Sequence, residues 1–161
     1  MEEWVILFLF AITLHNVEEA LWLPAWSKYA SKYHKPVGKS EFHFAVIIIT
    51  SLAYLSASFY LFFPNSMITK YILVGFLGSM IMNAIFPHLL ATIILKRYAP
   101  GLVTGILLNI PINSLVLYQF FQRDEITWIG LLLSTLILGG VLLGIIPILF
   151  KIGKSLVNNY S

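Results

Sequence analysis

The stretch WVILFLFAITLHNVEEALWL, residues 4–23, is long and apolar enough to cross a membrane, yet it carries three ionisable side chains. A helix needs about 20 apolar residues to span the hydrocarbon core of a bilayer. His15, Glu18 and Glu19 lie within about one helical turn of one another near the end of this run. Charged groups are costly in lipid, and those that occur there commonly mark a functional site. The stretch therefore predicts a transmembrane helix with a polar site on it.

The composition of the whole chain indicates the same environment. Hydrophobic residues make up 59% of the 161 residues, charged residues 11%, and the mean hydropathy is +0.88. A soluble domain has about 25% charged residues. We therefore expect a protein of the cell membrane. The absence of cysteine excludes disulfides, thiolate metal sites and cysteine nucleophiles.

The hydropathy pattern predicts an all-α bundle of five transmembrane helices. Their backbones must be helical because lipid offers no partner for an unpaired amide. The short connections predict antiparallel neighbours within a single domain over residues 1–161. The acidic start, with no small-residue cleavage site after the apolar run, predicts that the first helix is retained. The expected helices cover about 4–23, 42–63, 71–95, 102–121 and 127–150.

The basic residues predict the orientation of this bundle. The segments 24–41 and 96–101 and the tail after residue 150 carry eight of the ten lysines and arginines, and all three fall on one side of the membrane. The positive-inside rule then places the N-terminus outside and the C-terminus in the cytoplasm. Because this distribution accounts for the basic residues, we expect no nucleic-acid partner. The sequence predicts no particular oligomeric state.

Polar side chains from three of the expected helices fall at similar depth, in the half nearer the cytoplasm. At about 1.5 Å per residue, His15 lies roughly 12 Å from the cytoplasmic end of its helix, and His88 lies at a similar depth. Histidine and carboxylate ligands at i, i+3 and i+4 can converge on one cation, and a histidine from a facing helix can join them. Without sulfur, zinc, iron or manganese is favoured. The predicted metal ligands are His15, Glu18 and His88; Glu19 is the predicted catalytic acid or base; Asn83, Thr104 and Asn109 are predicted to line the site as cofactor-binding residues. Adjacent helical residues point about 100° apart, so the two glutamates should have unequal roles, and the sequence leaves open which is the ligand and which the acid or base.

Three motifs carry a resemblance to a known family. HNVEE at 15–19 resembles the defining motif of the HXXEE domain family of small, mostly bacterial membrane proteins. NAIFPH at 83–88 looks like the second polar cluster of that family, and RYAPGLVTG at 97–105 looks like its Pro-Gly turn and the threonine that follows. The resemblance implies importance for the motif residues and for Asn83, His88, Tyr98, Pro100, Gly101 and Thr104. It implies no reaction.

Each of these residues also has a purely structural interpretation. The glutamates could reach the interface or pair with a nearby lysine. His88 could replace a hydrogen bond broken by Pro87, and the asparagines could join helices, at about 1 kcal/mol each. Thr104 could cap the helix that follows the Pro-Gly turn, and Tyr98 could anchor the chain at the interface.

Three functional hypotheses follow from these patterns. The first is a small membrane-embedded enzyme with a divalent metal that acts on a lipophilic substrate by hydrolysis, isomerisation or oxidation. The second is a proton-coupled carrier in which the two glutamates relay protons. The third is a non-catalytic accessory subunit, which would not need a converging set of histidines and glutamates.

Overall fold

The computed structural model describes residues 2–33 and 35–158, whose regular elements are all helices, with no strand among them. The elements are α1 (Glu2–Trp26), α2 (Lys39–Phe62), α3 (Met67–Asn83), η1 (Ala84–Leu89), α4 (Leu90–Leu95), α5 (Leu102–Thr104), η2 (Gly105–Asn109), α6 (Ile110–Gln122) and α7 (Trp128–Asn158). Grouped into continuous runs, they make five helices that are long and apolar enough to cross a membrane. This confirms the all-α fold with five such helices.

The first helix continues past the proline at which it was expected to end. Pro24 lies inside α1, which ends at Trp26. A proline has no N–H, so it cannot pair with the carbonyl four residues earlier, which is that of Ala20. Nε2 of His43, on α2, lies 2.8 Å from this carbonyl oxygen. The histidine thereby replaces the missing hydrogen bond and ties α2 to α1.

Two of the five runs change their helical geometry at the level of the motif on α1. The third run is interrupted at Phe86, whose φ of −127° and ψ of 115° are extended rather than helical. Pro87 follows Phe86 directly, and a proline inside a helix commonly bends it. The fourth run contains the π-helical segment η2 directly before α6. The segments η1 and η2 contact each other, and η2 also contacts α1. The irregular backbone of these two segments is therefore packed against other helices of the bundle.

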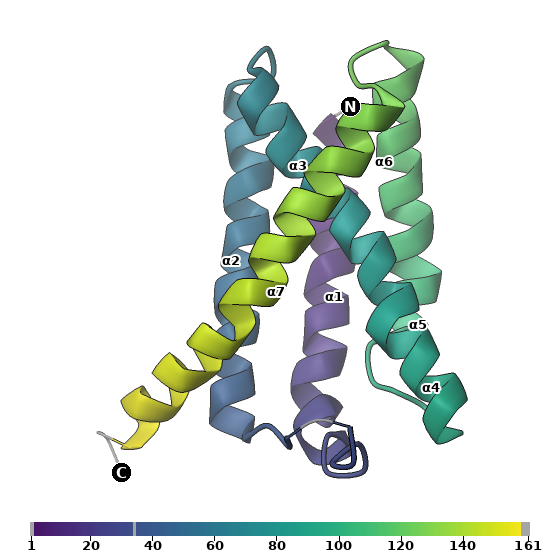
Figure 1. The fold of residues 1–161 in the computed structure, drawn as a ribbon. Helices are drawn as coiled ribbons and strands as arrows, with labels where there is room; N and C mark the ends of the chain where they lie inside the picture. The colour runs from purple at the N-terminus through teal and green to yellow at the C-terminus, as the bar shows by residue number, and fades with distance from the viewer. Residues whose placement is uncertain (1, 34, 159–161) are drawn as a thin grey trace.

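The helices pack so that α7 lies away from the motif (Figure 1). In the view shown, α7 crosses diagonally over α2 and α3, with α1 behind them. Gly78 permits the close contact between α3 and α7, since a Cβ there would lie 1.9 Å from Oγ1 of Thr135. The core, which includes Phe8, Leu77 and Phe120, fills the half of the bundle nearer the start of α1. The site is therefore formed by α1 and the third and fourth runs.

The two ends of the bundle differ in charge. The segment after α1, the end of α4 and the end of α7 lie at the same end in Figure 1. Together with Lys39 at the start of α2, these segments carry eight of the ten basic residues of the chain. At the opposite end, Lys70 is buried and pairs with Glu125 at 2.9 Å between Nζ and Oε2. One end therefore carries most of the positive charge.

Candidate functional site

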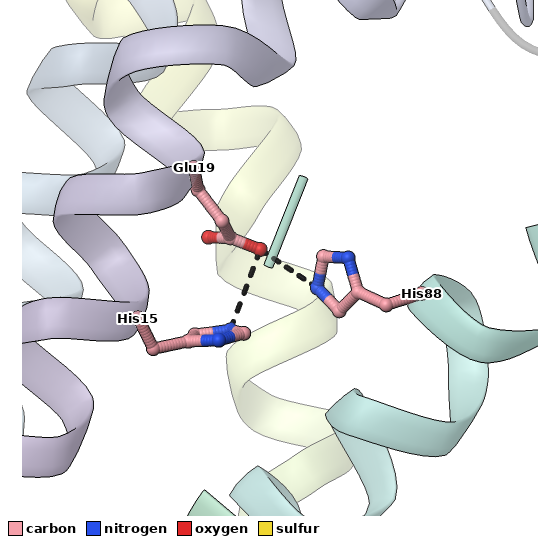
Figure 2. Close-up of side chains that lie close together, drawn as sticks. All are labelled: His15, Glu19 and His88. Carbon is pink, nitrogen blue, oxygen red and sulfur yellow. Dashed lines mark ion pairs between the residues drawn. The ribbon is translucent and has the colours of Figure 1, made fainter. Parts of the chain in front are cut away.

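Two histidines and a glutamate meet in the interior of the bundle (Figure 2). Oε1 of Glu19 lies 2.8 Å from Nε2 of His88 and 3.5 Å from Nε2 of His15. His15 and Glu19 are four residues apart on α1 and share a face, whereas His88 approaches from η1. His15 is fully buried and His88 is 3% exposed. The break at Phe86 is what re-aims the chain so that His88 faces α1.

Asn83 completes this cluster on the side of α3. Its amide nitrogen lies 3.0 Å from Nε2 of His15 and 3.2 Å from Nε2 of His88. The Asn83 amide nitrogen thus lies within hydrogen-bond distance of Nε2 of His15 and also of Nε2 of His88. Because the nitrogen and oxygen of an amide occupy nearly equivalent positions, the proton positions around the cluster decide which of the two faces inward. We call His15, Glu19, Asn83 and His88 the histidine cluster.

Glu18 has a different environment from its neighbour Glu19. Its Oε1 accepts hydrogen bonds from the Tyr98 hydroxyl and from the backbone N–H of Gly101, the latter at 2.8 Å. Its Oε2 accepts from the backbone N–H of Thr104 at 3.1 Å and from the Thr104 hydroxyl at 2.6 Å. These donors come from the turn before the fourth run and from its first residues. Glu18 therefore caps the N-terminus of another helix, where a negative charge is favourable.

Tyr98 remains a donor in this arrangement. It lies in the turn between α4 and α5, outside the apolar runs. Loss of hydration, together with the hydrogen bond to Glu18, raises the pKa of the Tyr98 hydroxyl to about 12. The hydroxyl is therefore protonated at neutral pH, and Glu18 keeps its donor.

The Thr104 hydroxyl links Glu18 to the histidine cluster. It has one proton, which it donates to the Glu18 carboxylate, an acceptor only. Its oxygen lies 3.1 Å from Nδ1 of His15 and can only accept from that nitrogen. Nδ1 of His15 therefore carries a proton. In neutral His15 the lone pair then lies on Nε2, the atom that faces Glu19 and His88.

Gly101 lies directly against both histidine rings. Its φ of 95° is in the left-handed region that favours glycine. A Cβ at this position would lie 2.7 Å from Cε1 of His88 and 3.0 Å from Cε1 of His15. The turn can thus approach the rings only with glycine at position 101. This approach also brings the backbone N–H of Gly101 to Glu18.

The structure brings most of the sequence-predicted site residues together, but it places the two glutamates in different environments. Glu19, assigned from sequence to acid–base chemistry, contacts both histidines, whereas Glu18, assigned to the metal, contacts the turn. Among the described residues, no side-chain hydrogen-bond partner is present for Asn109, which is fully buried and outside the histidine cluster. Asn113 donates to the carbonyl of Leu77 at 3.4 Å, as expected of an asparagine that joins helices.

Two contributions to the site had only weak signals in the sequence. The interpretation of Tyr98 as an interface anchor did not include its bond to Glu18, and the interpretation of Thr104 as a helix cap did not include its contact with His15. The signal for both was their position beside Pro100-Gly101, in the third motif that resembled the family. That turn brings both hydroxyls to α1.

Comparison with known proteins agrees with the motif. The family model described as "Protein of unknown function with HXXEE motif" matches residues 6–116, which include all the residues of the cluster and of the turn. The chain is also similar to "Uncharacterized protein YrkK" of Bacillus subtilis (strain 168), with 61% identity over 153 residues, covering 95% of this chain and 97% of that protein. No solved structure matches the chain. This chain belongs to the family of proteins with the HXXEE motif.

Proposed function

We propose that the protein is a membrane-embedded enzyme that holds a divalent metal ion in the histidine cluster and acts on a lipophilic substrate. The observation that carries this proposal is the convergence of His15, Glu19 and His88. One possible ligand atom from each lies within 4.8 Å of the others, in the interior of the bundle. Zinc, iron and manganese are the ions that imidazole and carboxylate ligands favour without sulfur.

The spacing of the possible ligand atoms supports a shared ion. Atoms that bind one tetrahedral ion at about 2.0–2.1 Å lie roughly 3.3 Å from one another. The separations from Glu19 to the two histidines are 2.8 and 3.5 Å. Those from the Asn83 amide are 3.0 and 3.2 Å. With its oxygen turned inward, Asn83 is a fourth ligand at the right distance from both imidazoles.

The proton positions in the cluster also favour a cation at its centre. If the Asn83 nitrogen faces inward, it donates to Nε2 of both histidines. Nε2 of His88 then carries a lone pair that faces the Glu19 carboxylate oxygen, and the two repel each other. If the oxygen faces inward, it needs a hydrogen-bond donor or a cation at both Nε2 atoms, and a proton on Nε2 of His15 would make that histidine charged, because its Nδ1 already carries one. A divalent ion satisfies the second arrangement without a charged histidine. It also compensates the charge of Glu19, which has no lysine or arginine partner among the described residues.

The hydrogen bonds that hold His15 from outside the cluster are of the type that metal centres use. A histidine ligand is normally held by a hydrogen bond from its other ring nitrogen. His15 has this bond through Thr104, which Glu18 holds in turn. We therefore propose that Glu19 is the metal ligand and that Glu18 is the positioning residue, the reverse of the assignment made from sequence. The second oxygen of Glu19, which points away from both histidines in Figure 2, is then the group available to accept a proton from substrate.

Metal content of the purified protein tests this proposal. The protein should retain about one transition-metal ion per chain through purification in metal-free detergent buffer, measured by plasma mass spectrometry. His15→Ala, His88→Ala and Glu19→Gln should each lose the ion. His43→Gln is the matched control, because it replaces a histidine outside the cluster and keeps a donor for the Ala20 carbonyl. A metal-free wild-type protein that cannot be loaded with zinc, iron or manganese would overturn the proposal.

A proton-coupled carrier is the second candidate, because a proton on His15 could supply the same positive charge. The apolar core between the site and the opposite end of the bundle argues against it, since a carrier needs a polar path to both sides. Proton uptake on reconstitution of metal-free protein in vesicles would favour the carrier over the enzyme.

We also propose the orientation expected from the charges. The end of the bundle with eight of the ten basic residues is assigned to the cytoplasm, so that the described chain starts outside and α7 ends inside. The histidine cluster then lies toward the cytoplasmic leaflet of the cell membrane.

A further inference from the structure

A groove of about 1220 Å³ runs along α1 beside the turn that follows α4. Its α1 wall is formed by side chains on the face of the helix next to Glu18, among them Leu14, Val17, Leu21 and Trp22. These side chains are 37%, 48%, 61% and 56% exposed. Val103 adds an exposed apolar side chain from the fourth run. The groove is therefore an apolar surface on a helix bundle that faces lipid.

Two positive charges lie at one end of this groove. Lys28 follows α1 and Arg97 precedes Tyr98, and both line the groove. The guanidinium of Arg97 lies 3.6 Å from the ring centroid of Tyr29, which also lines it. Stacking fixes the plane of the guanidinium and leaves its N–H edge able to bind an anion with two hydrogen bonds. Among the described residues, neither Lys28 nor Arg97 forms an ion pair with a carboxylate.

The groove shares a wall with the candidate functional site. Glu18 and Thr104 line it, and the same two residues hold His15 from the other side. The groove thus leads from the basic end of the bundle along α1 to the layer of side chains directly next to the histidine cluster. Its length along α1 is set by Leu14 and Trp26, which at about 1.5 Å per residue are roughly 18 Å apart.

We infer that this groove binds one amphiphile with a phosphate headgroup and a long hydrocarbon chain, drawn from the leaflet at the basic end of the bundle. The phosphate lies between Lys28 and Arg97, and the chain follows Leu21, Val17 and Leu14 toward the interior. Basic pockets between transmembrane helices bind lipid headgroups in this way. The inference deepens the proposed function and rests on it in one respect: it names the lipophilic substrate as a phosphate-bearing amphiphile.

Binding of hexadecyl phosphate tests the inference in nanodiscs of the zwitterionic lipid phosphatidylcholine. Saturable binding of about one molecule per chain is expected. Hexadecanol, which has the same chain without the charge, and inorganic phosphate, which has the charge without the chain, should bind much more weakly. Equal binding of hexadecanol, or displacement of hexadecyl phosphate by equimolar inorganic phosphate, would overturn the inference.

Substitutions locate the binding. Lys28→Gln and Arg97→Gln should each weaken hexadecyl phosphate binding about fivefold. Val103→Trp should weaken it without changing charge, because the larger side chain occupies the groove. The double variant Lys151→Gln, Lys154→Gln is the matched control, since it removes two charges from the same end of the bundle but away from the groove. An equal loss of hexadecyl phosphate binding in this control would show a general attraction to the basic end of the bundle and would overturn the inference that the groove is the binding site.

Metal content measured on the same samples separates this inference from the proposed function. Glu19→Gln should lose metal and still bind hexadecyl phosphate, whereas Arg97→Gln should keep metal and bind it weakly. A metal-free wild type that binds hexadecyl phosphate in the groove would overturn the enzyme proposal alone. A metal-loaded wild type with no saturable binding of hexadecyl phosphate would overturn the inference about the groove and leave the enzyme proposal standing.

Discussion

The Thr104 hydroxyl oxygen lies 3.1 Å from Nδ1 of His15, although 89 residues separate them in the chain. This contact decides which ring nitrogen of His15 carries the proton, because the only proton of the hydroxyl is donated to Glu18. It therefore turns a buried histidine into one with its lone pair facing a carboxylate and a second histidine.

Thr104→Val should lower metal affinity by roughly 10–100-fold while leaving the protein folded. Valine keeps the shape of threonine but removes the hydroxyl that orients His15 and bonds Glu18. Affinity is measured by competition with a chelator in detergent. Thr104→Ser is the control and should retain most of the affinity, because it keeps the hydroxyl. Wild-type affinity in Thr104→Val would refute the proposal that the Thr104 hydroxyl orients His15 for the metal.

The two glutamates should give different phenotypes. Glu19→Gln should remove the metal and should unfold at about the same temperature as the metal-free wild type, because it loses a ligand in an otherwise packed site. Glu18→Gln should retain most of the metal but destabilise the protein by about 1–3 kcal/mol, since an amide cannot accept all the hydrogen bonds made to the carboxylate. Metal analysis and thermal unfolding of both variants check this. Equal metal loss in the two variants would contradict the assignment.

Gly101→Ala should destabilise the protein by about 1–2 kcal/mol from its backbone conformation alone, and further through the contact with both histidine rings. Metal should be lost as well, because the rings have to move. Gly140→Ala provides a matched control on α7, where a Cβ would meet open space. That variant should be neutral or slightly stabilising. Similar melting temperatures for the two variants would refute the proposed packing of Gly101.

Cysteine labelling tests the orientation, since the chain has no cysteine of its own. Arg123→Cys and Lys32→Cys place single thiols at exposed positions at opposite ends of the bundle. A maleimide that does not cross membranes should label Arg123→Cys in intact cells and Lys32→Cys only after lysis. The reverse pattern would show that the basic end faces outward.

The number and approximate limits of the helices could be predicted from the sequence because each depends on local properties. An apolar run of sufficient length must be helical in lipid wherever its neighbours lie. The differences are at the ends. The second helix begins at Lys39 rather than near 42, and the last extends to Asn158 rather than near 150. For the last helix, the expected end near 150 is where the apolar run ends. The backbone hydrogen bonds of the helix continue beyond that run.

The sequence by itself also determined which residues could take part in a site, since ionisable groups in apolar helices are few enough to name. Only the tertiary structure decided how they are divided. Glu18 and Glu19 are adjacent on α1, and consecutive helical residues point about 100° apart, so sequence predicts that they differ but not which one meets His88. That depends on the extended backbone at Phe86, which turns His88 toward Glu19, and on the left-handed Gly101, which brings the Thr104 turn to Glu18. Both are contacts between segments far apart in the chain, and no local pattern encodes the direction from which a distant partner approaches.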